Sequence, residues 1–259
     1  ITRGIFTTPR QEFYYDRLIR EAVEEQAVKV GLLPLYAGRE HFTGIRSYGH
    51  HVHWSAGGAL ETLLLYMNMR NELWRVTAFA VDSPRLEKEK IPVVCDRLGN
   101  TWVTELMPRS YPLGTRSVKR MEPHPSKTKC YPLILDNFTG TLEVRASDVD
   151  PRSSATVAYI TLLLRAEQQK LRQEKALCVY SNELIHHNML RVKRHGLSRE
   201  GRIEIYQSDA MGEVSIQQEM IRHYEQEISP ILRKLQEKYQ GGFIHKLQLE
   251  EIERRIYDG

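Results

Sequence analysis

The 259-residue sequence is poor in cysteine and has no long hydrophobic run. Its three cysteines, Cys95, Cys130 and Cys178, are widely spaced and form no CxxC pair. This pattern argues against a disulfide scaffold or a zinc finger, and it indicates a reducing compartment. The longest strongly apolar stretches, such as residues 157–164, contain about eight residues, whereas a membrane helix needs roughly 20. We therefore expect no transmembrane segment.

Motifs of nucleotide and acyl-transfer chemistry are absent as well. The sequence contains no Gly-Lys-Ser/Thr, no G-x-G-x-x-G and no G-x-S-x-G. The nearest pattern is Ser55-Ala56-Gly57-Gly58, which we interpret as the start of a helix at residue 59, capped by Ser55. We assign no catalytic residue and no cofactor, and we predict a protein that is not an enzyme.

Positive charge, by contrast, is concentrated in two short segments. Residues 109–130, the first basic arm, hold six Lys or Arg against one acid, and residues 191–202, the second basic arm, hold five against one. The arms carry +5 and +4 while the whole chain carries only +4, so the remainder is acidic. This distribution is typical of a protein that binds a polyanion, because Lys and Arg release counterions from phosphates. The predicted RNA-binding residues are Arg109, Arg116, Lys119, Arg120, Lys127, Lys129, Arg191, Lys193, Arg194, Arg199 and Arg202.

Hydrophobic periodicity predicts an α+β fold in two parts. Residues 1–148 are expected to form an α+β domain, in which helices flank an antiparallel sheet and the first basic arm is a loop. Thr8, Pro9 and Gln11 mark the start of a first helix. A further helix is expected at residues 59–70, a strand at 73–81, and strand pairs within 91–107 and 131–146.

Residues 149–259 are expected to form a helical arm. Apolar residues recur every seven positions from Val157 to Ile185, and a second helix starts at Ser215 with an interruption at Ser229-Pro230. These helices are expected to form an antiparallel pair with a basic β-hairpin at its tip, residues 189–206, whose strands are 189–193 and 202–206. A C-terminal helix is expected at about residues 246–257.

The sharpest chemical pattern is a pair of histidines. On a strand, His51 and His53 would share one face, as in an HxH metal site, with His41 or Glu61 as a further ligand. In the alternative interpretation, these imidazoles cap, pack or contact RNA in a glycine-rich loop. The sequence alone therefore assigns no metal and keeps the HxH pair as an alternative.

A second pattern resembles half of a di-iron site. Glu183 and His186 have the Glu-x-x-His spacing, but such a site needs the motif twice. The nearest second copy, Glu219 and His223, is spaced by four residues rather than three. We interpret the Glu183–His186 pattern as a solvated helix end next to the basic hairpin.

A basic, motif-poor chain with protruding arms and long helices is similar to the structural proteins of organellar ribosomes. The leading hypothesis is a non-catalytic subunit of a large ribonucleoprotein, a mitochondrial ribosome, that contacts rRNA through both arms and neighbouring subunits through its helices. The alternatives are an accessory subunit of an organellar membrane complex and a metal-dependent hydrolase built on the HxH pair. The chain starts at Ile1, which fits loss of an organellar presequence as well as trimming. A mitochondrial matrix location follows from the leading hypothesis.

Overall fold

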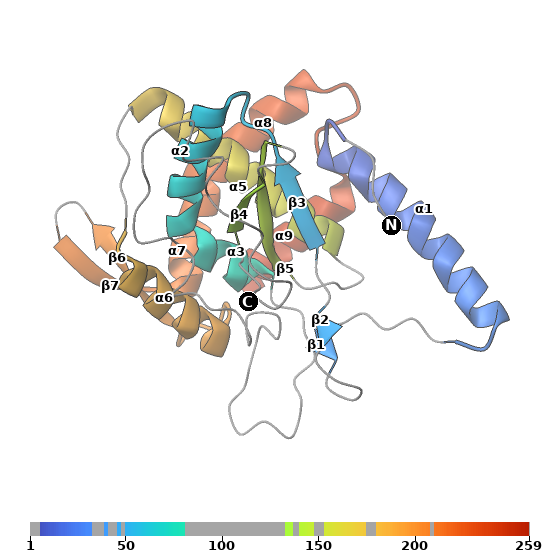
Figure 1. The fold of residues 1–259 in the computed structure, drawn as a ribbon, viewed down its shortest axis with the longest axis horizontal. Coiled ribbons are helices and arrows are strands. Elements are labelled where there is room, and N and C mark those ends of the chain that lie inside the picture. Colours follow the sequence, from blue (N-terminus) through green and yellow to red (C-terminus); the bar gives the residue numbers. More distant parts are fainter. Residues whose placement is uncertain are drawn as a thin grey trace.

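We describe the fold from a computed structural model (Figure 1). The structure describes residues 6–32, 39–40, 46–47, 50–80, 133–136, 140–147, 153–174, 180–207 and 210–258. The helical elements in these ranges are α1 (Pro9–Lys29), α2 (Ala59–Asn71), α3 (Leu73–Phe79), α5 (Ser153–Glu174), α6 (Asn182–His195), α7 (Ile216–His223), the π-helical turn η3 (Tyr224–Ile228), α8 (Ser229–Lys238) and α9 (Lys246–Asp258). The strands are β1 (Arg39–Glu40), β2 (Arg46–Ser47), β3 (His50–Trp54), β4 (Leu133–Asp136), β5 (Thr141–Ser147), β6 (Arg202–Gln207) and β7 (Ala210–Ser215). Helices combined with antiparallel sheets confirm the predicted α+β class.

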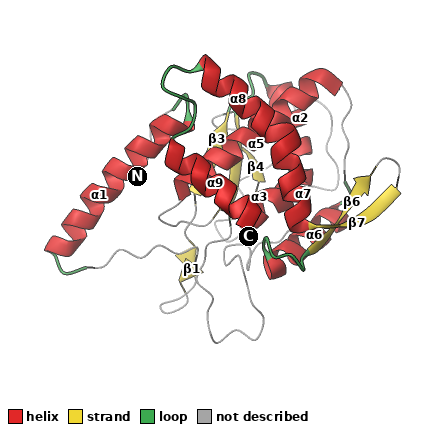
Figure 2. Cartoon of the chain, turned by 180° about the vertical axis from the view of Figure 1, so that it is seen from behind, coloured by secondary structure: helices red, strands yellow, loops and turns green. Residues whose placement is uncertain are grey.

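A three-stranded antiparallel sheet, in the order β3-β5-β4, lies at the centre of the fold. Val144 of the middle strand pairs with Val52 on one side and with Leu133 on the other, and all three side chains are buried. Helices α2, α3 and α5 pack against this sheet. Seen from behind, the strands are largely hidden, with α5, α8 and α9 in front of them (Figure 2). One face of the sheet therefore supports a helical layer.

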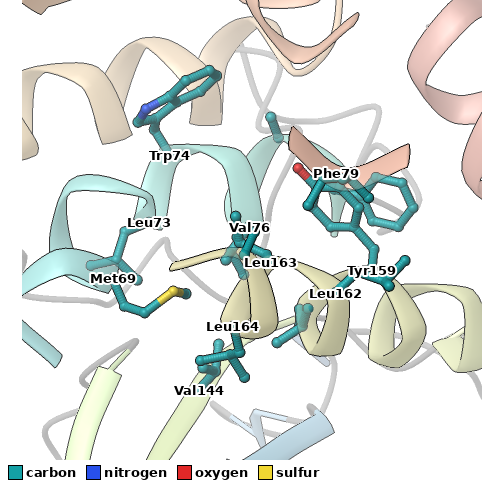
Figure 3. Close-up of a cluster of buried hydrophobic side chains, with 14 of the residues drawn as sticks. Met69, Leu73, Trp74, Val76, Phe79, Val144, Tyr159, Leu162, Leu163 and Leu164 are labelled. Carbon is teal, nitrogen blue, oxygen red and sulfur yellow. The ribbon is translucent and has the colours of Figure 1, made fainter. Parts of the chain in front are cut away.

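Helix α5 passes through the hydrophobic core. Leu162, Leu163 and Leu164 are fully buried although they are consecutive, so most of the circumference of this helix is covered by neighbours. Tyr159 stacks on Phe79 of α3, with ring centroids 4.2 Å apart and an interplanar angle of 16° (Figure 3). The core cluster contains side chains from residues 52–144 and from residues 155–256. The predicted domain boundary between residues 148 and 149 lies outside the described residues, and the two-domain division stays a prediction.

Local capping signals place several helices where the sequence predicts them. The Thr8 hydroxyl accepts a hydrogen bond from the backbone N–H of Gln11, and the Gln11 side chain accepts one from the N–H of Thr7. Ser215 accepts from the N–H of Gln218 in the same way at the start of α7. These bonds satisfy donors that have no partner within the first helical turn. The helices expected at residues 9, 59, 215 and 246 are confirmed.

Two predicted strands are wrong because each is a helix. Residues 73–79 form α3, in which every residue is buried. A short, mostly apolar run fits a buried helix as well as a strand. Residues 189–193 belong to α6, where Ile185, Met189 and Val192 are buried at helical spacing and Ser181 caps the first turn.

The hairpin in this region is consequently formed by other strands than predicted. Strand β6 pairs not with residues 189–193 but with β7, in a register that runs from Arg202 opposite Ser215 to Gln207 opposite Ala210. The strand pair expected within residues 131–146 is confirmed as β4 and β5. The pair expected within residues 91–107 lies outside the described residues. The interruption expected at Ser229-Pro230 is present, because α7 passes into the π-helical turn η3 before α8 begins.

Candidate functional site

Strands β3 and β5 place His53 directly opposite Glu143. The two residues are partners in the antiparallel register, between the pair Val52–Val144 and the pair Trp54–Leu142. Because successive side chains alternate between the faces of a sheet, His53 and Glu143 share the face opposite to the buried Val52 and Val144. The His53 side chain is 44% exposed and that of Glu143 is 11% exposed.

The two nitrogens of the His53 ring have different surroundings. Nδ1 lies 3.1 Å from the hydroxyl oxygen of Thr141, within hydrogen-bond distance. Nε2 lies 3.8 Å from Oε1 of Glu143, which is longer than a hydrogen bond. A tetrahedral zinc ion with bonds of about 2.1 Å separates two ligand atoms by about 3.5 Å. The spacing thus suits two ligands of one ion, and a metal-bound histidine typically donates its second ring N–H to an oxygen such as that of Thr141.

The other residues of the predicted HxH site do not complete it in the described part of the chain. The ladder register shifts between His50 and Val52, so His51 sits at a β-bulge and the strict alternation assumed for the pair is interrupted. His41 and the side chain of His51 lie outside the described residues. The carboxylate of Glu61 lies against Gly57 and Gly58 at the start of α2.

Ser55 does not cap α2, contrary to the sequence interpretation. The capping position is held by Gly58, whose extended backbone leads into the helix without a side-chain hydrogen bond. The Glu183–His186 pattern also remains incomplete. Glu183 is exposed in the first turn of α6, and the neighbouring His187 lies 3.4 Å from Glu204 of β6.

The second basic arm is only partly available for an external anion. Arg191 forms an ion pair with Glu213 of β7. Arg202 donates to the carbonyl oxygens of Arg199 and Gly201 at 2.7 Å and 3.2 Å, although its side chain is largely exposed. The side chains of Lys193 and Arg194 lie outside the described residues, as does the whole first arm: Arg109, Arg116, Lys119, Arg120, Lys127 and Lys129.

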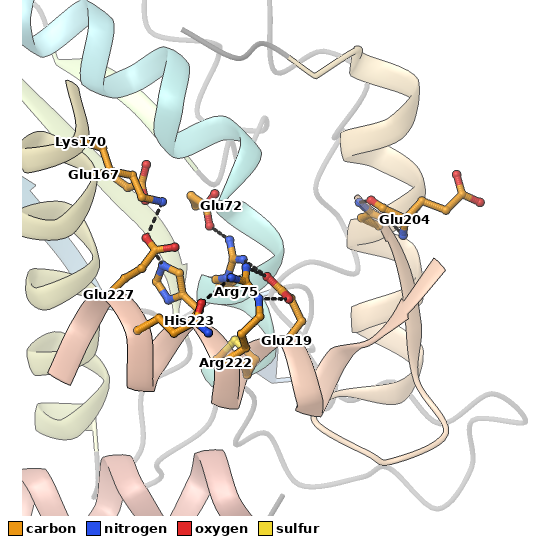
Figure 4. A network of polar contacts seen from close by, with 12 residues as sticks. Glu72, Arg75, Glu167, Lys170, Glu204, Glu219, Arg222, His223 and Glu227 are labelled. Carbon is orange, nitrogen blue, oxygen red and sulfur yellow. Dashed lines mark hydrogen bonds and ion pairs between the residues drawn. The ribbon is translucent and has the colours of Figure 1, made fainter. Parts of the chain in front are cut away.

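A buried group of charged residues joins α3, α5, α7 and η3; we call it the ionic network (Figure 4). Its members are Glu72, Arg75, Glu167, Lys170, Glu219, Arg222, His223 and Glu227. Arg75 lies between Glu72 and Glu219 and donates to Glu219 at 2.7 Å. Arg222 binds the same Glu219 carboxylate through two contacts, of 2.5 Å and 2.7 Å. The contacts of Arg75 and Arg222 outweigh burial and lower the pKa of Glu219.

The other half of the ionic network is centred on Lys170. Its ammonium group lies 3.0 Å from Glu167 and 2.5 Å from Glu227. Burial raises the pKa of Glu167, whereas the contacts of Glu227 with His223 and Lys170 outweigh burial and lower its pKa to about 2. Burial, reinforced by the nearby Arg75, lowers the pKa of His223 to about 4, so this imidazole is neutral at pH 7.

Sequence reasoning missed the ionic network. Glu219 and His223 attracted attention only as a near match to a di-iron motif. Arg75 and Glu219 are separated by 144 positions, and no local pattern reports such a pairing. One weak signal is present, since the charged Arg75 falls within the mostly apolar segment of residues 73–79.

No protein-family model matches the chain, and no curated protein matches it. A solved structure to which it is similar is that of the Pup ligase PafA of the prokaryotic ubiquitin-like modification pathway in complex with ADP. The TM-score is 0.46 at 14% identity, with 96% of this chain covered. The match covers 51% of the Pup ligase chain, so the present chain spans about half of that length.

These comparisons and the described helices bear on two sequence-based expectations. The structural neighbour is an enzyme, and we therefore withdraw the prediction that the protein is not one. We base the functional proposal on the geometry around His53 and not on this likeness. The expectation of no transmembrane segment agrees with the structure, since none of the helices in the described ranges combines the length and apolar character needed to cross a bilayer.

Proposed function

We propose that the protein is a metal-dependent enzyme whose site lies on the polar face of the β3-β5-β4 sheet. The observation that carries the proposal is the arrangement of His53, with Nδ1 held by Thr141 and Nε2 facing Glu143 at 3.8 Å. The β-bulge next to His53 adds support, because such irregularities are over-represented beside active sites. The HxH pattern of the sequence offers His51 as the candidate for a third ligand.

Each residue would have a defined role in this site. Nε2 of His53 and a carboxylate oxygen of Glu143 would bind a divalent ion, and Thr141 would fix the orientation and tautomer of the imidazole. A divalent ion bound by few protein ligands keeps open positions for water and substrate. When bound, such an ion would lower the pKa of a bound water and polarise a carbonyl or phosphoryl oxygen, which is the chemistry of a hydrolase.

Metal titration of three variants tests the proposal. His53→Gln and Glu143→Gln each remove a ligand, and we expect Mn²⁺ or Zn²⁺ affinity at this site to fall at least tenfold. Thr141→Val removes only the orienting oxygen, and we expect a loss of about 10- to 100-fold. Calorimetric titration of the metal-free full chain measures these changes. The same variants should abolish metal-dependent hydrolysis of p-nitrophenyl phosphate or acetate where the wild type shows it.

A matched control comes from a second exposed His–Glu pair. His187 is also 44% exposed and lies 3.4 Å from Glu204, but it has no orienting hydroxyl within hydrogen-bond distance among the described residues. His187→Gln should leave metal affinity unchanged. An equal loss in His187→Gln and His53→Gln would contradict the proposal.

RNA contact is a second candidate function, carried by the exposure of Arg199 and Arg202 beside β6. The charge reversals Arg199→Glu and Arg202→Glu should weaken binding to structured RNA and flatten its salt dependence, measured by fluorescence anisotropy. Lys119→Glu and Arg120→Glu make the same test in the first basic arm. Membership of a mitochondrial ribosome, docking on an organellar membrane complex and a matrix location stay predictions.

A further inference from the structure

The ionic network holds more negative than positive charge in its buried part. Its four carboxylates have exposed side-chain fractions between 2% and 23%. Only two largely buried cations oppose them, Arg75 at 7% and Lys170 at 31%. The third cation, Arg222, is 47% exposed, so water screens it. Even with Arg222 counted, the carboxylates outnumber the cations by one, and a bound cation would offset this excess of negative charge.

His223 points to the same conclusion. Its side chain is 1% exposed, and neither ring nitrogen has a hydrogen-bond partner. Oε2 of Glu227 lies 3.4 Å from Nε2, but the pair does not meet hydrogen-bond geometry. Buried polar atoms are almost always paired, and an unpaired one costs free energy. A buried imidazole without a hydrogen-bond partner, next to a cluster of carboxylates, is suited to bind a metal ion.

Three donor groups converge at this point. Each of the residues Glu72, Glu167 and His223 offers one ligand atom, and these three atoms lie within 4.8 Å of one another. They come from separate segments, namely the start of α3, the middle of α5 and the end of α7. We propose that these three side chains form a buried site for a divalent transition-metal ion, Zn²⁺ or Mn²⁺, which joins the three helices.

The donor set decides which ions fit. One imidazole nitrogen and two carboxylate oxygens suit Zn²⁺ and Mn²⁺, whereas Mg²⁺ prefers oxygen ligands and retains its waters. Coordination bonds of about 2.0–2.2 Å require the donor atoms to approach more closely than 4.8 Å. Binding should therefore draw α3, α5 and α7 together and protect their amides from hydrogen exchange.

The first experiment separates this site from the one at His53. The metal-free full chain and its His53→Gln variant are loaded with Zn²⁺, freed of excess ion by gel filtration and analysed for bound metal by mass spectrometry. We expect His53→Gln to retain one ion per chain. A His53→Gln chain that retains no ion would overturn the buried site, whatever the wild type binds. Loss of the proposed function alone would instead leave one ion in both proteins.

The second experiment removes the buried ligand. His223→Leu keeps the side-chain volume, and in the His53→Gln background it should abolish the remaining metal binding and the metal-induced rise in melting temperature. Glu72→Gln provides a second variant in case His223→Leu fails to fold, with an expected affinity loss of at least tenfold. Retention of the ion and of the melting shift in a folded variant of either kind would refute the proposal. Mg²⁺ should produce no shift in any of these proteins.

Discussion

At the scale of single residues, Arg75 is the charge on which the ionic network depends. Its guanidinium lies between Glu72 and Glu219 and is 7% exposed. We expect Arg75→Met to leave the Glu72 carboxylate without its partner and Glu219 with Arg222 alone, and to lower the free energy of unfolding by about 3–5 kcal/mol. Urea unfolding followed by circular dichroism measures the change. Arg17→Ala, which breaks the exposed Arg17–Glu21 pair, is the control and should change little.

The hydrogen bonds of Glu251 predict how the stability of the protein changes in acid. Both carboxylate oxygens accept hydrogen bonds from Arg254 and one also accepts from Arg255, each at 2.8 Å, and these contacts lower the pKa of Glu251 to about 2. The unfolded chain binds this proton more readily, so the stabilisation is complete above about pH 4.5 and is lost as the pH falls toward 2. Glu251→Gln should therefore cost about 1 kcal/mol at pH 7, after allowance for partial exposure, and much less at pH 3.

Unfolding by urea at pH 7 and at pH 3 gives the difference in free energy of unfolding between the wild type and Glu251→Gln. Glu250→Gln, which affects an exposed contact with Lys246, is the matched control on the same helix and should show no such dependence. A Glu251→Gln penalty that stays constant across the two pH values would contradict the explanation.

At the scale of elements, the cap of α7 carries a measurable share of stability. The Ser215 hydroxyl accepts from the N–H of Gln218, and the residue is buried at the junction with β7. We expect Ser215→Ala to destabilise the protein by about 1 kcal/mol, because it leaves a helix donor unsatisfied. Ser198→Ala, at an exposed turn position, should be nearly neutral in the same thermal melts.

Helix starts and the β4–β5 pair could be predicted because their signals are local. Capping residues such as Thr8 and Ser215 act within one helical turn. Segments such as α3 could not be assigned, since complete burial removes the polar side of the pattern. The His53 site was visible in part, because HxH is a local motif, but its partner Glu143 follows only from strand pairing. The ionic network depends on tertiary contacts throughout.

At the scale of the whole molecule, the core cluster bears on the number of cooperative units. Side chains from residues 52–144 pack with side chains from residues 155–256, and α5 is buried among them. We therefore expect a single unfolding transition by calorimetry, with coincident loss of helical signal and tyrosine and tryptophan fluorescence. Two separated transitions would support the division at residue 148 instead.

A cavity made by mutation in the middle of α5 should lower the stability of the whole molecule, because both parts of the core cluster pack on this helix. Leu163 is fully buried, and Leu163→Ala is expected to cost about 2–5 kcal/mol. Both spectroscopic probes should shift by the same amount in urea. Leu190→Ala, at an exposed position of α6, is the control and should have a small effect.

The π-helical turn at residues 224–228 sets the rotational phase between α7 and α8. Such a turn accommodates one more residue than an α-helical turn, and one residue corresponds to about 100° of rotation in a regular helix. A chain shortened by one residue there would lose the π-helical insertion, and α7 would be turned about its axis relative to α8. Glu219 and His223 would then face away from Arg75 and Lys170. The single extra residue thus acts as an angular offset that sets which face of α7 meets α3 and α5.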